Sequence, residues 1–241
     1  MLRTSMFAAA VAVSAGSAHA VFFSFASDLG DQSWTFSGGP GLTFTDATGP
    51  NNPTHLVVDD NNGPLPPLSV STQFNASITL TPVGSLPLGG GQFSHNYKAA
   101  GSFSFTDILS GVTLLNVTFS NGLYTSLGTE FAWGSTGGLQ ASAAVGSIVN
   151  MTWSGAALPG YGLAPGALGP ADFGFDLSAL NTNGVIPFNF QNLGVGFTPA
   201  TMMPVQQWYS ESSFSGSAAI PSPGALGLMT LAGLAASRRR R

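Results

Sequence analysis

Glycine and proline interrupt the chain so often that no long helix is expected between residues 21 and 217. The sequence holds 32 glycines and 16 prolines, and no segment of this stretch keeps the 3.6-residue periodicity of an amphipathic helix. Residues 74–81 instead alternate, with Phe74, Ala76, Ile78 and Leu80 at even positions and polar residues between them. This is the pattern of a half-buried β-strand. The sequence therefore predicts an all-β fold.

Many other short runs rich in Phe, Trp, Val and Thr share this character, and turn-forming residues separate them. More than a dozen such runs at close spacing predict an antiparallel β-sandwich or jelly roll. Residues 155–170 are rich in glycine, proline and alanine and are expected to form one long loop. The expected strands are residues 21–26, 34–37, 42–45, 74–81, 101–106, 112–119, 123–127, 130–133, 139–145, 148–153, 173–177, 185–190, 195–198 and 205–214.

The first 20 residues have the layout of a secretory signal peptide. Arg3 lies in a short leading segment, residues 7–13 are apolar, and Ala18 and Ala20 flank His19 as in an A-x-A cleavage site. We therefore expect export and cleavage after Ala20, which leaves residues 21–217 as one β-sandwich domain.

The last 24 residues, 218–241, have the layout of a membrane stop. Pro221, Ser222 and Pro223 precede an uncharged run at 224–237, and Arg238, Arg239, Arg240 and Arg241 follow it. The run would form roughly 21 Å of helix, short of the ~30 Å hydrocarbon core, so the long arginine side chains are expected to reach the interface. Arginines stay on the cytoplasmic side, so the body is expected outside the membrane.

This tail resembles the sorting signal of PEP-CTERM proteins, which has a Pro-Glu-Pro motif, a short apolar helix and an arginine-rich end. The chain matches at Pro221 and Pro223, with Ser222 in place of the glutamate, and at the run and arginines that follow. The resemblance implies a membrane-embedded partner, a sorting protease of the exosortase type, and delivery to the cell surface. It covers a tenth of the chain and implies no activity for the body.

Charge and cysteine content exclude several functions. Residues 21–217 contain one basic residue, Lys98, against ten acidic residues, a formal net charge of −9. A body of this charge repels phosphate backbones, so no nucleic-acid partner is expected. The chain has no cysteine, which excludes thiol catalysis and cysteine-ligated zinc.

Two arrangements would give the body an enzymatic function. Glu130 and Glu211 are the two glutamates and both lie beside aromatic residues, as in jelly-roll glycosidases, whose paired carboxyl groups lie within about 5 to 9.5 Å of each other. Ser94, His95 and Asp107 contain the residue types of a hydrolase triad, although no nucleophile elbow accompanies them. In the alternative interpretation the glutamates end strands, the aromatic residues fill the core, and the histidine lies in a loop where it bonds to water or to the backbone.

Asp59 and Asp60 begin an Asp-Asp-Asn-Asn-Gly segment whose oxygen atoms suit calcium. The spacing of an EF-hand is absent, because no glutamate falls at the closing position. A turn is the favoured interpretation, and no metal or other cofactor is expected.

Taken together, the sequence predicts an exported, non-enzymatic protein of the cell surface or extracellular matrix, associated with exopolysaccharide. The alternative is a carbohydrate-binding module or jelly-roll glycosidase that uses tryptophans as stacking platforms. Two exposed tryptophans on one concave face would favour the alternative, and burial of all four would favour the non-enzymatic protein. The four are Trp34, Trp133, Trp153 and Trp208.

Overall fold

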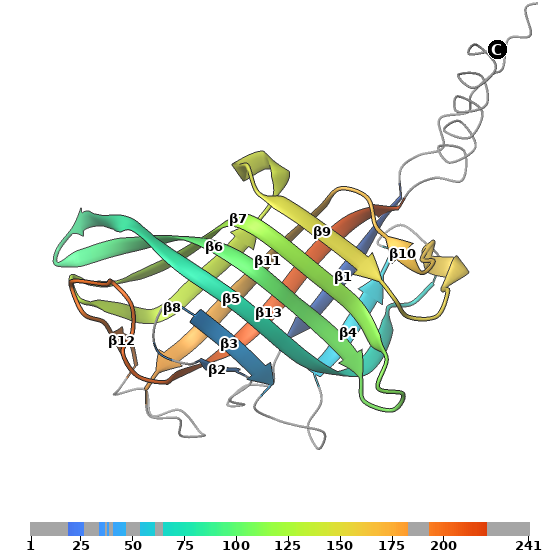
Figure 1. The fold of residues 1–241 in the computed structure, drawn as a ribbon, viewed down its shortest axis with the longest axis horizontal. Coiled ribbons are helices and arrows are strands. Elements are labelled where there is room, and N and C mark those ends of the chain that lie inside the picture. Colours follow the sequence, from blue (N-terminus) through green and yellow to red (C-terminus); the bar gives the residue numbers. More distant parts are fainter. Residues whose placement is uncertain are drawn as a thin grey trace, which may run out of the picture. The chain divides into compact units, whose positions relative to one another are not determined.

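Thirteen β-strands form most of the chain that the computed structural model describes, namely residues 19–26, 34–36, 38, 41–46, 54–60, 65–182 and 193–220 (Figure 1). All strand pairings in these residues are antiparallel, which confirms the all-β, antiparallel prediction. The strands are β1 (His19–Ala26), β2 (Trp34–Phe36), β3 (Gly41–Asp46), β4 (Thr54–Asp59), β5 (Leu68–Gly89), β6 (Gln92–Asp107), β7 (Thr113–Thr129), β8 (Ala132–Ala141), β9 (Ile148–Trp153), β10 (Gly166–Ala167), β11 (Ala171–Asn181), β12 (Val195–Gly196) and β13 (Trp208–Ile220).

Several strands are longer than predicted because glycines lie inside them. β5 has 22 residues and β7 has 17, and β7 joins two runs that the sequence analysis separated at Gly122. At Gly101 the register between β6 and β7 shifts, and a Cβ atom there would overlap the carbonyl oxygen of Ser77 on β5. The extra residue of this β-bulge lies in β7, where Ser120 and Asn121 oppose Ala100 of β6, so Gly101 lies beside a bulge inside two continuous strands.

Other predicted boundaries are wrong for local reasons. Glu130 and Phe131 form the turn between β7 and β8. The strand expected at 139–145 ends at Ala141, and a short 3-10 turn, η2 (Ala143–Val145), follows it. The loop expected at 155–170 contains a second 3-10 turn, η3 (Pro159–Tyr161), and β10, which pairs with β9. The strand expected at 185–190 lies outside the described residues.

Eight strands pair around the sheet in the order in which they follow one another in the chain, and β2, β3, β9, β10 and β12 pair outside this order. β4, β5, β6, β7 and β8 pair in this order, β8 pairs with β11, β11 with β13, and β13 with β1, which pairs with β4. The sheet therefore closes on itself. Among the described strands this is an up-and-down order, whereas a jelly roll uses Greek-key connections.

Two layers of this sheet face each other, and their strands cross in Figure 1. β5, β6 and β7 belong to one layer, and β1, β11 and β13 belong to the other. Phenylalanine rings from the two layers meet between them, with centroid distances of 5.0 Å for Phe103 and Phe173 and 5.8 Å for Phe74 and Phe175. Alternation places these rings inside and leaves the residues between them on the outer faces.

A second set of aromatic residues in the core carries polar atoms. The Trp133 Nε1–H group donates a hydrogen bond of 2.8 Å to the Tyr97 hydroxyl, which donates one of 2.7 Å to the carbonyl oxygen of Met202. Trp208 stacks on Phe36 with a centroid distance of 3.5 Å. Phenylalanines thus fill one part of the interior, and hydrogen-bonded tyrosine and tryptophan fill another.

Residues Ala20–Ile220 form one compact unit. Within the described residues, no helix is long and apolar enough to cross a membrane. The tail from Pro221 onward lies outside those residues, as does the expected signal peptide up to Ala18. Ala20 lies in β1, and the register of β1 with β4 begins at Phe22, so cleavage after Ala20 would keep these pairs.

Candidate functional site: a polar groove on the outer face

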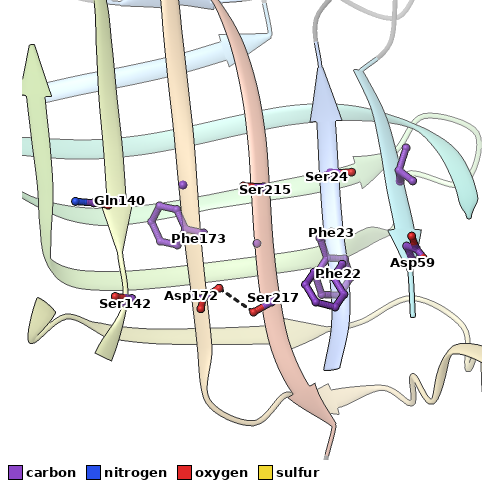
Figure 2. A pocket seen from close by; sticks show the side chains of 13 residues that line it. Phe22, Phe23, Ser24, Asp59, Gln140, Ser142, Asp172, Phe173, Ser215 and Ser217 are labelled. Atoms are coloured by element: carbon purple, nitrogen blue, oxygen red, sulfur yellow. Dashed lines mark hydrogen bonds between the residues drawn. The ribbon is translucent and has the colours of Figure 1, made fainter. Parts of the chain in front are cut away.

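A hollow of about 660 Å³ crosses the outer face of the layer that contains β11 and β13 (Figure 2). Its residues come from five strands, β8, β11, β13, β1 and β4, and we call it the groove. The lining residues are Phe22, Phe23, Ser24, Val57, Asp59, Gln140, Ser142, Asp172, Phe173, Gly174, Ser215, Gly216 and Ser217.

Strand register places the polar side chains of the groove in rows. Gly174 of β11 pairs with Gln140 of β8 on one side and with Ser215 of β13 on the other. In the next row Asp172 pairs with Ser217, whose hydroxyl donates a hydrogen bond of 2.8 Å to Asp172 Oδ1, as Figure 2 shows. Hydroxyl, amide and carboxylate groups therefore face solvent at neighbouring positions.

Gly174 keeps the middle of the groove open. A Cβ atom at this position would approach only the carbonyl oxygen of Leu139, at 4.0 Å, which is an ordinary contact distance. The absence of a side chain there is therefore not imposed by crowding. It exposes the backbone of the sheet between Gln140 and Ser215.

Phe22 provides an aromatic ring at the other side of the groove. It is 36% exposed, whereas Val21 and Phe23 beside it are 0% and 1% exposed, because alternate residues of β1 point to opposite faces. Phe22 pairs with Asp59 of β4, so the ring and a carboxylate lie in one cross-strand pair.

The groove is acidic. Asp59 and Asp172 lie in it, and its lining residues include no lysine, arginine or histidine. A ligand for this surface needs apolar atoms for the ring and hydroxyl groups for the polar rows. Sugar rings have both, since their C–H faces pack on aromatic rings while their edges carry hydroxyls.

The glutamate pair of the glycosidase alternative does not form. Glu211 lies in β13 opposite Ser178, whose hydroxyl donates to Glu211 Oε2 at 3.4 Å. Glu130 lies in the β7–β8 turn, at the far end of β8 from the residues that pair with β11. At about 3.3 Å per residue, Glu130 and Glu211 are separated by roughly 15–20 Å along the strand direction. This is more than the distance between the paired carboxyl groups of a glycosidase.

The tryptophan platforms of the carbohydrate-binding alternative do not form at the three tryptophans whose side chains the structure describes. Trp133, Trp153 and Trp208 are 1%, 2% and 0% exposed, so none of them can stack on a ligand. Trp34 lies in β2, and its side chain is outside the described part of the structure.

The predicted triad does not form either. His95 is 0% exposed; its Nε2–H donates to the carbonyl oxygen of Thr129 at 2.8 Å, and its Nδ1 accepts from the Ser85 hydroxyl at 2.6 Å. Asp107 ends β6, roughly 40 Å along the strand. There the Ser110 hydroxyl and the Leu109 N–H hold the pKa of Asp107 below its usual value. His95 is therefore a structural residue that joins β5, β6 and β7.

Asp59 and Asp60 end up in different environments. Asp59 lines the groove, and Asp60 is only 8% exposed. Within the described part of the chain, no three His, Asp or Glu side chains come together as metal ligands. Asn61, Asn62 and Gly63 lie outside that part.

No protein-family model, curated protein or solved structure matches this chain. The groove therefore provides the structural basis for a proposed function of the folded body. The sequence did not point to Phe22, Gln140, Asp172 and Ser217 as site residues, although alternation along β1, β8, β11 and β13 places each of them on an outer face.

Proposed function

We propose that this chain is an exported, non-enzymatic protein of the cell surface or extracellular matrix, and that its body binds an extracellular polysaccharide in the groove. The observation that carries the proposal is the exposed Phe22 ring beside Asp59, on a face otherwise lined by serines, Gln140 and Asp172. The ring offers an apolar surface, and the polar groups around it can fix the orientation of a bound ligand.

In this proposal each kind of side chain has a separate role. The Phe22 ring packs on the C–H face of a sugar. Asp172 and Asp59 accept hydrogen bonds from sugar hydroxyls, and Gln140 both donates and accepts. Ser217 already donates to Asp172, so this carboxylate is held in place before a ligand arrives.

Delivery is the second part of the proposal. Residues 1–20 act as a signal peptide removed after Ala20. Residues 218–241 act as a PEP-CTERM-like signal that holds the chain in the membrane by a short helix until an exosortase-type protease processes it. What supports this part is the order of Pro221, Ser222, Pro223, the apolar run and the four arginines. Removal of the signal peptide leaves Phe22 as the second residue of the mature chain, still paired with Asp59.

Replacement of Phe22 by alanine tests polysaccharide binding. Phenylalanine exposes about 200 Å² when free, so a ligand that covers the exposed 36% of Phe22 buries about 70 Å². At about 25 cal/mol per Å² this contributes about 1.8 kcal/mol, or about 20-fold in affinity. We expect Phe22→Ala to weaken binding of the polysaccharide by about 20-fold, measured as reduced retardation of the protein in gels that contain the polysaccharide.

Phe131→Ala is the matched control, because Phe131 is 48% exposed in the β7–β8 turn and does not line the groove. It should bind like the unmodified protein. Equal loss in both variants, or no loss in Phe22→Ala, would refute the proposed site.

A further inference from the structure

A second hollow adjoins the groove. It has a volume of about 290 Å³ and shares Gln140 and Gly174 with the groove. Its other lining residues are Leu123, Thr125, Gly138, Leu139, Phe175 and Asp176. These add β7 to the five strands of the groove, so the two hollows form one continuous surface from β7 to β4.

We propose that the two hollows form a single extended groove that binds an uncharged, linear polysaccharide running across the strands. This inference rests on the proposed function. Six neighbouring strands spaced by about 4.8 Å span about 24 Å, which is long enough for several consecutive sugar rings.

Glycines open the extended groove along its path. Gly138 pairs with Asp176 of β11 and Thr125 of β7, and Gly174 pairs with Gln140 and Ser215. A Cβ atom at Gly138 would meet only a backbone oxygen at 3.8 Å and a carboxylate oxygen of Asp176 at 3.9 Å. Both glycines thus have room for a side chain that the sequence does not supply.

Charge excludes an anionic ligand. Asp59, Asp172 and Asp176 lie along the extended groove, and no basic side chain is among the lining residues of either hollow. Signal-peptide removal would add one cation near it, the α-amino group of Val21. A polyuronate would place its carboxylates against three aspartates, and like charges in contact oppose binding.

Filling the glycines tests the extended groove without harming the fold. Threonine suits a strand better than glycine does, so Gly174→Thr and Gly138→Thr should melt at the same temperature as the unmodified protein or higher. Gly196→Thr is the matched control: Gly196 lies in β12, where a Cβ atom meets nothing within 4 Å, and it lines neither hollow.

The secreted protein and its variants are titrated with an uncharged glucan, with short oligosaccharides of that glucan, and with a polyuronate. We expect Gly174→Thr to weaken binding of the glucan and of its oligosaccharides by more than tenfold. Gly138→Thr should weaken binding of the long glucan severalfold and leave the shortest bound oligosaccharides unaffected. Gly196→Thr should change neither, and the polyuronate should bind at least tenfold more weakly than the glucan.

Different failures refute different statements. Normal binding of the long glucan by Gly138→Thr would overturn the extended groove and leave polysaccharide binding intact. Equal or tighter binding of the polyuronate would overturn the charge selection alone. If the unmodified protein binds none of these polysaccharides, the proposed binding function itself fails, and the inference fails with it.

Discussion

Two buried tyrosines on neighbouring strands provide a sharp test of how the core is stabilised. The rings of Tyr97 on β6 and Tyr124 on β7 lie 5.7 Å apart, and their exposed fractions are 0% and 2%. The Tyr97 hydroxyl accepts a hydrogen bond from Trp133 and donates one to the Met202 carbonyl. The Tyr124 hydroxyl has no hydrogen-bond partner of good geometry, although the Ser126 hydroxyl is near enough to oppose the rise in its pKa. The same change, tyrosine to phenylalanine, should therefore have different effects at the two positions.

Tyr97→Phe leaves the buried indole N–H of Trp133 and the part-buried carbonyl oxygen of Met202 without their partner. A buried unsatisfied group costs about 1–3 kcal/mol and a part-buried one less, so we expect a total loss of about 2–4 kcal/mol in the free energy of unfolding. Tyr124→Phe removes a buried hydroxyl that already lacks a partner, so the free energy of unfolding should stay the same or rise by about 1 kcal/mol.

Urea denaturation of the two variants, followed by tryptophan fluorescence, measures both changes. The midpoints should move apart, with Tyr97→Phe lower and Tyr124→Phe unchanged or higher, at equal slopes. A loss of more than about 1 kcal/mol in Tyr124→Phe would show that its hydroxyl is hydrogen-bonded in solution. Equal losses in both variants would refute the reasoning that the Trp133–Tyr97–Met202 chain stabilises this part of the core.

Two further predictions concern pH and the tail. Burial raises the pKa of Tyr97 to about 12, and burial together with the nearby Tyr97 raises that of Tyr124. Tyrosine in the unfolded state ionises near pH 10, so the unfolded state loses these protons before the folded state does. The melting temperature should therefore stay constant up to about pH 10 and fall toward pH 12. A constant melting temperature between pH 10 and pH 12 would contradict the prediction. Replacement of Arg238, Arg239, Arg240 and Arg241 by serine should release uncleaved protein into the medium or leave it misoriented, as immunoblots of cell fractions would show, whereas Lys98→Ser should leave location unchanged. Full-length protein that washes off cells without detergent, arginines attached, would refute an anchoring or sorting tail.

The fold class was predictable because alternation survives in the sequence wherever one side of a strand is buried. Residues 74–81 alternate since Phe74, Ala76, Ile78 and Leu80 point into the core. Strand ends were less predictable. Gly101 and Gly122 resemble turn signals in the sequence, but each lies inside a strand, where only the three-dimensional packing shows why glycine is needed.

The three residues considered as a hydrolase triad do not come together, because residues on one extended strand move apart with each position along it. Ser94, His95 and Asp107 lie on one strand, β6, so their separation grows by about 3.3 Å with each residue. His95 instead finds its partners on the neighbouring strands, at Ser85 and Thr129. Strand pairing decides such contacts, and the sequence alone does not reveal it.

The groove was not predicted for a related reason. Phe22 meets Asp59, and Asp172 meets Ser217, through strand register alone. The alternative with tryptophans as stacking platforms fails because large rings gain most free energy from burial, and the three tryptophans whose side chains are described lie in the core. The exposed ring belongs to Phe22, between two buried neighbours on β1, where alternation directs it outward. Alternation thus identifies residues that face solvent. The extended groove also depends on register, because register places Gly138 beside Asp176 and Gly174 beside Gln140.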